Sequence, residues 1–162
     1  MGSLNDDIRE YRLQLKEGRI QTAYKGIMTF MSGLKSHLEK DYPDFSTSAL
    51  YFGYMDMTYF AFTPAYLKER KLKIAIVYLH EQGRFEVWLG GTNRKIQGDY
   101  IERLRHKDLH GYHLSRVEPG VDSIIESVIV EQPNFDQPEA LSDRIEDKTI
   151  MFINDMRSIL NQ

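Results

Sequence analysis

The 162-residue sequence contains no cysteine. Disulfide bonds, thiolate metal sites and cysteine-based catalysis are therefore excluded, and the absence is compatible with a reducing compartment. The chain also has no apolar run near the ~18 residues that a membrane span needs. Its N-terminus has no basic flank followed by an apolar segment, so we expect neither a signal peptide nor a membrane anchor. The resulting expectation is a cytoplasmic protein.

Internal repeats, low-complexity runs and interdomain linkers are also missing. The hydrophobic fraction of 41% and charged fraction of 28% are typical of a globular chain. We therefore expect one domain, residues 1–162. The sequence has no Gly-x-Ser-x-Gly elbow to anchor a hydrolase triad. We predict no catalytic residue, no cofactor and no metal site; whether the protein is an enzyme stays open, with the balance against it.

The net charge of −3 is unevenly distributed along the chain. Residues 64–117 carry 11 basic and 6 acidic side chains, whereas residues 118–162 carry 3 basic and 10 acidic ones. A basic segment can meet phosphates, so nucleic acid is a possible partner. The alternative is that the acidic tail neutralises the basic segment within the same molecule, and we favour it.

Apolar residues recur at helical spacing in two N-terminal segments, Leu4 to Lys16 and Ile20 to Leu38. The first ends at Glu17-Gly18. The second ends before Pro43, because the residue preceding a proline is pushed out of the helical conformation. We predict a helical hairpin or a bent helix pair.

A β-hairpin is predicted from Lys73 to Gly90. Residues 73–79 are rich in isoleucine, valine and alanine, as in a buried strand, and Gln82-Gly83 is a turn signal. Residues 84–89 alternate, which places Phe85, Val87 and Leu89 on one face and Arg84, Glu86 and Trp88 on the other.

The remaining segments complete an α+β fold class. The aromatic-rich residues 46–63 predict strands interrupted near Gly53, and the β-branched run 124–130 predicts another strand. The predicted architecture is an antiparallel central sheet, made of hairpin 73–90 and strands near 46–63 and 124–130. It is flanked by the N-terminal helix pair, helix 93–105 and C-terminal helix 138–161.

The strand-to-helix junction Gly90-Gly91-Thr92-Asn93-Arg94-Lys95 is the first candidate site. Two glycines permit a sharp turn, Thr92 or Asn93 can cap the helix, and a helix N-terminus offers unpaired N–H groups to an anion. We therefore place Gly91, Asn93 and Arg94 in a predicted ligand site. The alternative is an ordinary turn, because the segment matches no phosphate-loop motif.

The second group of candidates lies on the predicted strands. Asp56 within its aromatic run faces a pocket near Tyr59 and Trp88, or lies in a turn, where aspartate is common. Glu86 either lies on a covered face, where a buried carboxylate needs a partner and Arg84 is too near in sequence to be the automatic choice, or is solvated on a half-exposed face. We include Asp56, Tyr59, Glu86 and Trp88 in the predicted ligand site.

The residues 84–95, Arg-Phe-Glu-Val-Trp-Leu-Gly-Gly-Thr-Asn-Arg-Lys, and the segment 120–126 resemble an uncharacterised prokaryotic domain family of about this length. That resemblance implies an architecture and no mechanism. The order of elements also resembles the PD-(D/E)xK nuclease-like fold, which implies an acid on the second core strand and Glu-x-Lys on the third. Here residues 74–79 carry no acid and the third strand reads Glu86-Val87-Trp88, so the metal-dependent chemistry of that fold is not expected.

Two functions remain from these observations. The favoured one is a non-catalytic domain that binds a small anionic ligand or a protein partner near Trp88, Asn93 and Arg94, since aromatic residues and arginine suit such contacts. The alternative is a nucleic-acid-associated protein with a degenerate nuclease-like core. Three histidines, His106, His110 and His113, suggest a metal cluster superficially, but Gly111 ends any helix that would align them.

Overall fold

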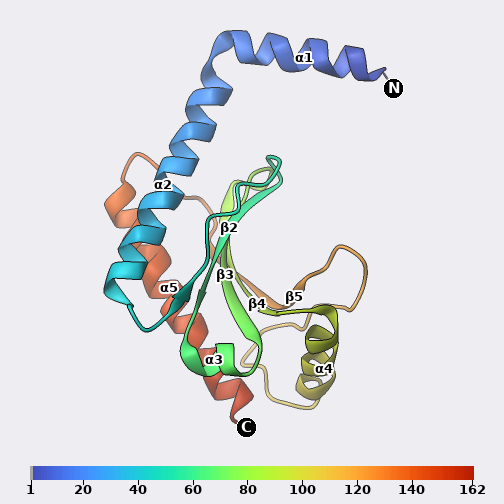
Figure 1. The fold of residues 1–162 in the computed structure, drawn as a ribbon, viewed down its shortest axis with the longest axis vertical. Helices are drawn as coiled ribbons and strands as arrows, with labels where there is room; N and C mark the ends of the chain where they lie inside the picture. Colours follow the sequence, from blue (N-terminus) through green and yellow to red (C-terminus); the bar gives the residue numbers. More distant parts are fainter. Residues whose placement is uncertain (1) are drawn as a thin grey trace.

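A computed structural model describes residues 2–162 of the protein. Helices flank one curved sheet, as Figure 1 shows. The elements in chain order are α1 (Leu4–Glu17), α2 (Arg19–Asp41), β1 (Ser46–Thr47), β2 (Met57–Thr63), α3 (Ala65–Glu69), β3 (Leu72–Leu79), β4 (Arg84–Gly91), α4 (Arg94–Leu104), β5 (Ser123–Val130) and α5 (Pro138–Leu160).

The sheet has five strands in the order β1-β2-β3-β4-β5, and every neighbouring pair is antiparallel. The predicted hairpin is confirmed and pairs from Leu72 opposite Gly91 to Leu79 opposite Arg84. Its turn contains Gly83 at φ 64°, a left-handed conformation that glycine adopts without steric cost. The α+β class, the antiparallel sheet and the flanking helices are as the sequence predicted.

One face of the sheet forms the hydrophobic core. Phe60, Ile76 and Val87 lie on this face with no exposed surface. The helices α2 and α5 run side by side over it, and α5 contributes buried Phe152 and Met156. Because strand side chains alternate, the residues between these core positions point to the opposite face, which no helix covers along its length.

The aromatic segment 46–63 forms less strand than its composition suggests. Only β1 and β2 are regular, and an isolated bridge joins Tyr51 to Tyr59. Between Tyr51 and Tyr59 the chain turns at Gly53, whose φ is 74°. A Cβ atom there would lie 1.9 Å from the carbonyl oxygen of Met57. The predicted interruption at Gly53 is therefore confirmed, with a physical reason.

The N-terminal helices form a bent pair, with Gly18 at φ 79° as the single residue between them. The first helix, α1, extends away from the rest of the molecule, and none of its residues is buried. Among residues 2–162, no helix is long and apolar enough to cross a bilayer.

Candidate functional site

A cavity of about 440 Å³ opens on the sheet face opposite α2 and α5. Tyr59, Ala75 and Trp88, from three adjacent strands, line it, and the first residues of α4 close one end. This volume falls within the roughly 300–1,000 Å³ of typical small-molecule sites. The cavity therefore has the size expected for a metabolite-sized ligand.

Small residues on two central strands create the cavity. Ala75 pairs with Trp88, and Lys73 pairs with Gly90, so each small residue lies directly opposite a large one and the two small residues lie diagonally to each other. A Cβ atom at Gly90 would lie 3.6 Å from Cε of Lys73, which places the lysine stem across this glycine. Lys73 lines the cavity, and its ammonium has no hydrogen-bond or ion-pair partner within residues 2–162.

Aromatic rings provide the apolar part of the lining. The rings of Tyr51 and Tyr59 lie 5.0 Å apart between centroids, across the bridge that joins their backbones. The indole N–H of Trp88 donates to Oε1 of Glu86 at 2.8 Å, which fixes the ring in one orientation. A planar or apolar ligand would meet a preformed aromatic surface here.

Glu86 lies behind Trp88 and does not line the cavity. It is only 2% exposed, so its solvated alternative is wrong. Its partner is Arg84, whose Nε donates to Oε2 of Glu86 at 2.8 Å. Arg84 was not the automatic choice from the sequence, but residues two apart on a strand share a face and can meet. The hydrogen bond to Glu86 is also the main cause that raises the pKa of Arg84.

Gly91 and Asn93 line the cavity and also build the start of α4. A Cβ atom at Gly91 would lie 2.7 Å from the backbone nitrogen of Gln97, so only glycine lets the helix begin so close to the strand. The Oδ1 atom of Asn93 accepts from the backbone N–H of Ile96 at 2.9 Å, which confirms the predicted cap. The backbone N–H groups of Arg94 and Lys95, the first two residues of α4, have no acceptor in the part of the chain described here.

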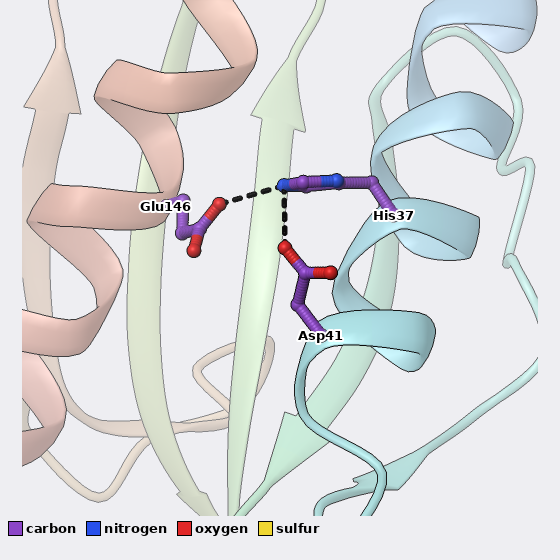
Figure 2. Close-up of side chains that lie close together, drawn as sticks. All are labelled: His37, Asp41 and Glu146. Carbon is purple, nitrogen blue, oxygen red and sulfur yellow. Dashed lines mark hydrogen bonds and ion pairs between the residues drawn. The ribbon is translucent and has the colours of Figure 1, made fainter.

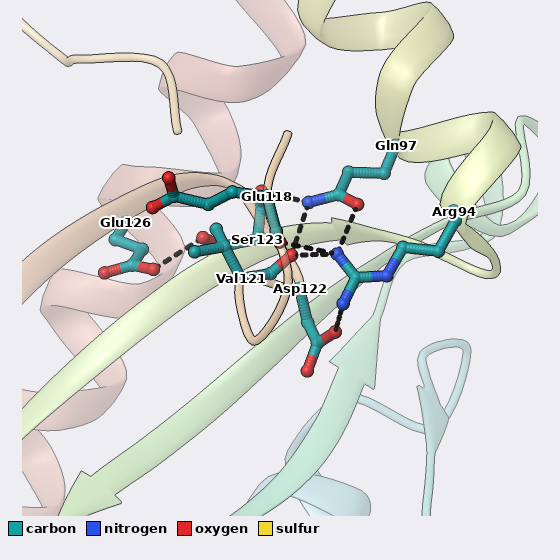
Figure 3. A network of polar contacts seen from close by, with 7 residues as sticks. All are labelled: Arg94, Gln97, Glu118, Val121, Asp122, Ser123 and Glu126. Carbon is teal, nitrogen blue, oxygen red and sulfur yellow. Dashed lines mark hydrogen bonds and ion pairs between the residues drawn. The ribbon is translucent and has the colours of Figure 1, made fainter. Parts of the chain in front are cut away.

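Arg94 joins α4 to the loop before β5, as Figure 3 shows. Its guanidinium donates to the carbonyl oxygens of Val121 and Glu118 and pairs with Oδ1 of Asp122 at 3.1 Å. These contacts already engage the Arg94 guanidinium, which the sequence led us to expect as the group that binds an anion. Arg94 therefore holds a wall of the cavity in place, and the less encumbered cation beside it is Lys73.

Gln97 completes the same wall and is only 1% exposed. Its Nε2 atom donates to the carbonyl oxygens of Val121 at 2.9 Å and Ser123 at 3.0 Å. A buried amide with both protons satisfied stabilises one defined position of the loop. The loop 118–122 and the start of α4 thus form one rigid side of the site.

Asp56 lies in a turn, which was one of the two positions that the sequence left open for it. It is exposed, does not line the cavity, and its Oδ1 accepts from the backbone N–H of Tyr54 at 2.9 Å. This hydrogen bond is the main cause that lowers the pKa of Asp56.

The structure brings together five of the seven predicted residues, which are Tyr59, Trp88, Gly91, Asn93 and Arg94, and leaves Asp56 and Glu86 outside the lining. Sequence reasoning missed Lys73, although its alternation with Ala75 and Val77 places it on the face of Trp88. It also missed Gln97, a polar residue in the apolar stripe of α4. For Asp122 no local signal exists, because a loop brings it to the cavity.

A second polar cluster ties α2 to α5, as Figure 2 shows. Nε2 of His37 lies 2.7 Å from Oε1 of Glu146 and 3.4 Å from Oδ2 of Asp41. The hydrogen bond to Glu146 is the main cause that raises the pKa of His37 above 6.5. Tyr42 donates its hydroxyl to the other oxygen of Glu146 at 2.8 Å.

The three ligand atoms of His37, Asp41 and Glu146 lie within 4.8 Å of one another, close enough to share a divalent cation. Each of them already has a partner in the cluster, so the arrangement is complete as a tie between helices. Within residues 2–162, His106, His110 and His113 form no such group.

The acidic C-terminal third neutralises part of the basic middle third. Glu131 lies 3.6 Å from Arg84, and Asp122 lies 3.1 Å from Arg94. The expected charge balance within the molecule is confirmed at these two arginines. It weakens the case for a phosphate-binding basic surface.

Fold and cavity together define an α+β domain with a ligand-sized hollow on the uncovered face of its sheet. The chain belongs to the family described as domain of unknown function (DUF7000), whose model matches residues 4–160. The expected membership of an uncharacterised family is thereby confirmed. Searches of curated proteins and of solved structures found no match, so the resemblance to the nuclease-like fold gains no support.

Proposed function

We propose that the domain binds a small ligand with a planar or apolar body and one anionic group in the 440 Å³ cavity. The observation that carries this proposal is that Lys73 lines the cavity while its ammonium has no partner in residues 2–162. An ammonium without a partner at the wall of an aromatic cavity can form a charge-assisted hydrogen bond with an anionic group of a ligand.

The two halves of the cavity suit the two halves of such a ligand. Trp88 and Tyr59 offer ring surfaces to a planar body. Lys73 and the unpaired N–H groups at the start of α4 attract a carboxylate or phosphate, because the helix dipole adds positive potential there.

Binding is favoured over catalysis because most polar groups around the cavity already hold its walls. Asn93 caps α4, Gln97 holds the loop, and Arg94 pairs with Asp122. General acid–base catalysis needs a group free to exchange a proton with the ligand. Apart from Lys73, these charged and amide groups are engaged in the walls, which favours recognition of a ligand over its conversion.

The test uses Trp88, which is the single tryptophan of the chain and lies in the cavity itself. Carboxylated and phosphorylated planar metabolites are titrated while Trp88 emission and the melting temperature are recorded. We expect at least one class to change the emission and to raise the melting temperature. Lys73→Met keeps the aliphatic stem and removes the charge, and should weaken binding about 10- to 100-fold, the equivalent of one charge-assisted hydrogen bond.

Lys95→Met is the matched control. Lys95 is exposed and does not line the cavity, so this variant makes the same charge change while binding stays at the wild-type level. If no compound class changes Trp88 emission, or if both lysine variants bind equally well, the proposal is wrong. The cytoplasmic location expected from the sequence stays a prediction, which fractionation of cells expressing the tagged chain would test.

A further inference from the structure

The first helix, α1, has an apolar stripe that the rest of residues 2–162 leaves largely uncovered. Leu4, Ile8, Tyr11 and Leu15 follow one another at intervals of four, three and four residues and so share one helix face. None of α1 is buried, and Leu4 is 74% exposed. An isolated helix of this length is marginal in water, so a stable α1 needs a surface to pack on.

The charged residues beside this stripe are segregated by sign. At about 100° per residue, Arg12 and Lys16 lie along one edge of the stripe, and Asp7 and Glu10 lie along the other. Neither Arg12 nor Lys16 has an ion-pair partner within residues 2–162. The surface that receives α1 is therefore expected to be apolar with an acidic rim on one side.

A groove with these properties runs between α2 and the beginning of α5. Its volume is about 1400 Å³, above the roughly 1,000 Å³ limit of small-molecule sites, so a protein segment fits it better. Ile27, Phe30 and Phe135 provide apolar lining. Its acidic rim consists of Asp136, Glu139 and Asp143, none of which forms an ion pair in the described chain.

Two glycines make the α2 side of the groove shallow. Gly26 and Gly33 lie seven residues apart on the groove side of the helix, and a Cβ atom at either would meet nothing within 4 Å. A glycine inside a helix costs about 1 kcal/mol relative to alanine. Nothing in the chain's own packing requires that cost here, but close approach of a second helix would.

The groove cannot receive α1 of its own chain. Gly18 is the only residue between α1 and α2, whereas two helices need a loop of roughly two to five residues to fold back as a hairpin. Figure 1 accordingly shows α1 directed away from the body of the molecule. A second copy of the chain is under no such restriction.

We infer that two copies form a two-fold symmetric dimer in which α1 of each lies in the α2–α5 groove of the other. The stripe of α1 covers the apolar lining, and Arg12 and Lys16 face the acidic rim. Because each copy offers both surfaces, the contact is made twice and the assembly closes.

The test is the oligomeric state of the full chain across a broad micromolar range, by light scattering and sedimentation. We expect the wild type at about twice the 19.0 kDa mass of one chain. Ile8→Asp removes the centre of the stripe and Gly33→Leu fills the groove, and either change should give a monomer with an unchanged β-sheet signal in circular dichroism.

Two matched controls accompany these variants. Leu13→Asp places the same charge at a comparably exposed apolar residue on the opposite side of α1. Gly98→Leu adds the same side chain to a helical glycine of α4 that also has open space and does not line the groove. Both controls should remain dimeric.

A monomeric wild type at the highest concentration overturns the inference. So does a dimer that survives Gly33→Leu but is lost with Ile8→Asp, because that result would indicate direct pairing of two α1 helices. A dimer that both variants leave intact would place the interface elsewhere.

Discussion

Replacement of Glu86 by alanine tests the polar arrangement that supports the cavity. The carboxylate is 2% exposed and accepts two hydrogen bonds, from Nε of Arg84 and from the indole N–H of Trp88, both at 2.8 Å. Glu86→Ala leaves both donors without an acceptor inside the protein. It therefore perturbs stability and the orientation of Trp88 through one change.

The magnitude follows from the two bonds. A hydrogen bond to a charged group contributes about 1.5–3 kcal/mol. Arg84 is 31% exposed and water can replace its lost partner, so that bond counts at the lower end. We expect Glu86→Ala to lower the free energy of unfolding by about 3 kcal/mol, which corresponds to a drop of roughly 6–12 °C in melting temperature for a chain of this size. Glu86→Gln keeps an acceptor for Trp88 and should cost about half as much.

The assay is urea unfolding followed by circular dichroism, with Trp88 emission recorded before denaturant is added. Released from Glu86, the indole should show a changed emission maximum in Glu86→Ala and a nearly native one in Glu86→Gln. Glu131→Ala is the control, because Glu131 also pairs with Arg84, at 3.6 Å, but is 68% exposed. It should change stability by less than about 0.5 kcal/mol. A Glu86→Ala protein within about 1 kcal/mol of wild type, with native emission, would refute this reasoning.

Two further predictions concern the helix start and the tie between helices. Gly91→Ala places a Cβ atom 2.7 Å from the backbone nitrogen of Gln97 and should lower the free energy of unfolding, measured by thermal unfolding, by about 2 kcal/mol. The control Gly98→Ala, where the added Cβ atom meets open space, should be neutral or slightly stabilising. Equal stabilities of the two variants would contradict the clash. The bond to Glu146 raises the folded-state pKa of His37 above 6.5, so its contribution is complete below pH 6.5 and is lost as the pH rises through the folded pKa. Unfolding titrations at several pH values should show a fall of about 1 kcal/mol in the wild type, and an identical fall in His37→Gln would assign it to other groups.

The fold was predictable where neighbouring segments determine each other. The hairpin needs only two alternating runs and the turn at Gln82-Gly83, and all three are local. The segment 46–63 was less predictable, because its aromatic composition favours strand while Gly53 forces a turn. The exposure of α1 was not predictable at all, since the spacing of Leu4, Ile8 and Tyr11 is the same whether the stripe is covered by the chain or by another molecule.

The candidate site likewise has a part that local sequence predicts and a part that depends on tertiary packing. The alternation of strand residues placed Trp88 and Glu86 on one face, and would have placed Lys73 there as well. Whether that face is covered depends on tertiary packing, so the sequence alone does not determine whether the Glu86 carboxylate is buried and paired or solvated. Contacts from Arg94 to Asp122 span a loop whose path no periodicity encodes.

Some residues weaken the helix or strand that contains them and have no visible stabilising role in the fold. Such residues indicate functional surfaces. Gly90 within a strand, and Gly26 and Gly33 within a helix, each weaken the element that contains them. Alanine would fit the space at all three. Gly90 keeps the cavity open beside the unpaired ammonium of Lys73, and the two helical glycines keep the groove shallow. Because natural sequences depart from local optima chiefly at functional sites, these three glycines support the cavity and the groove as functional surfaces.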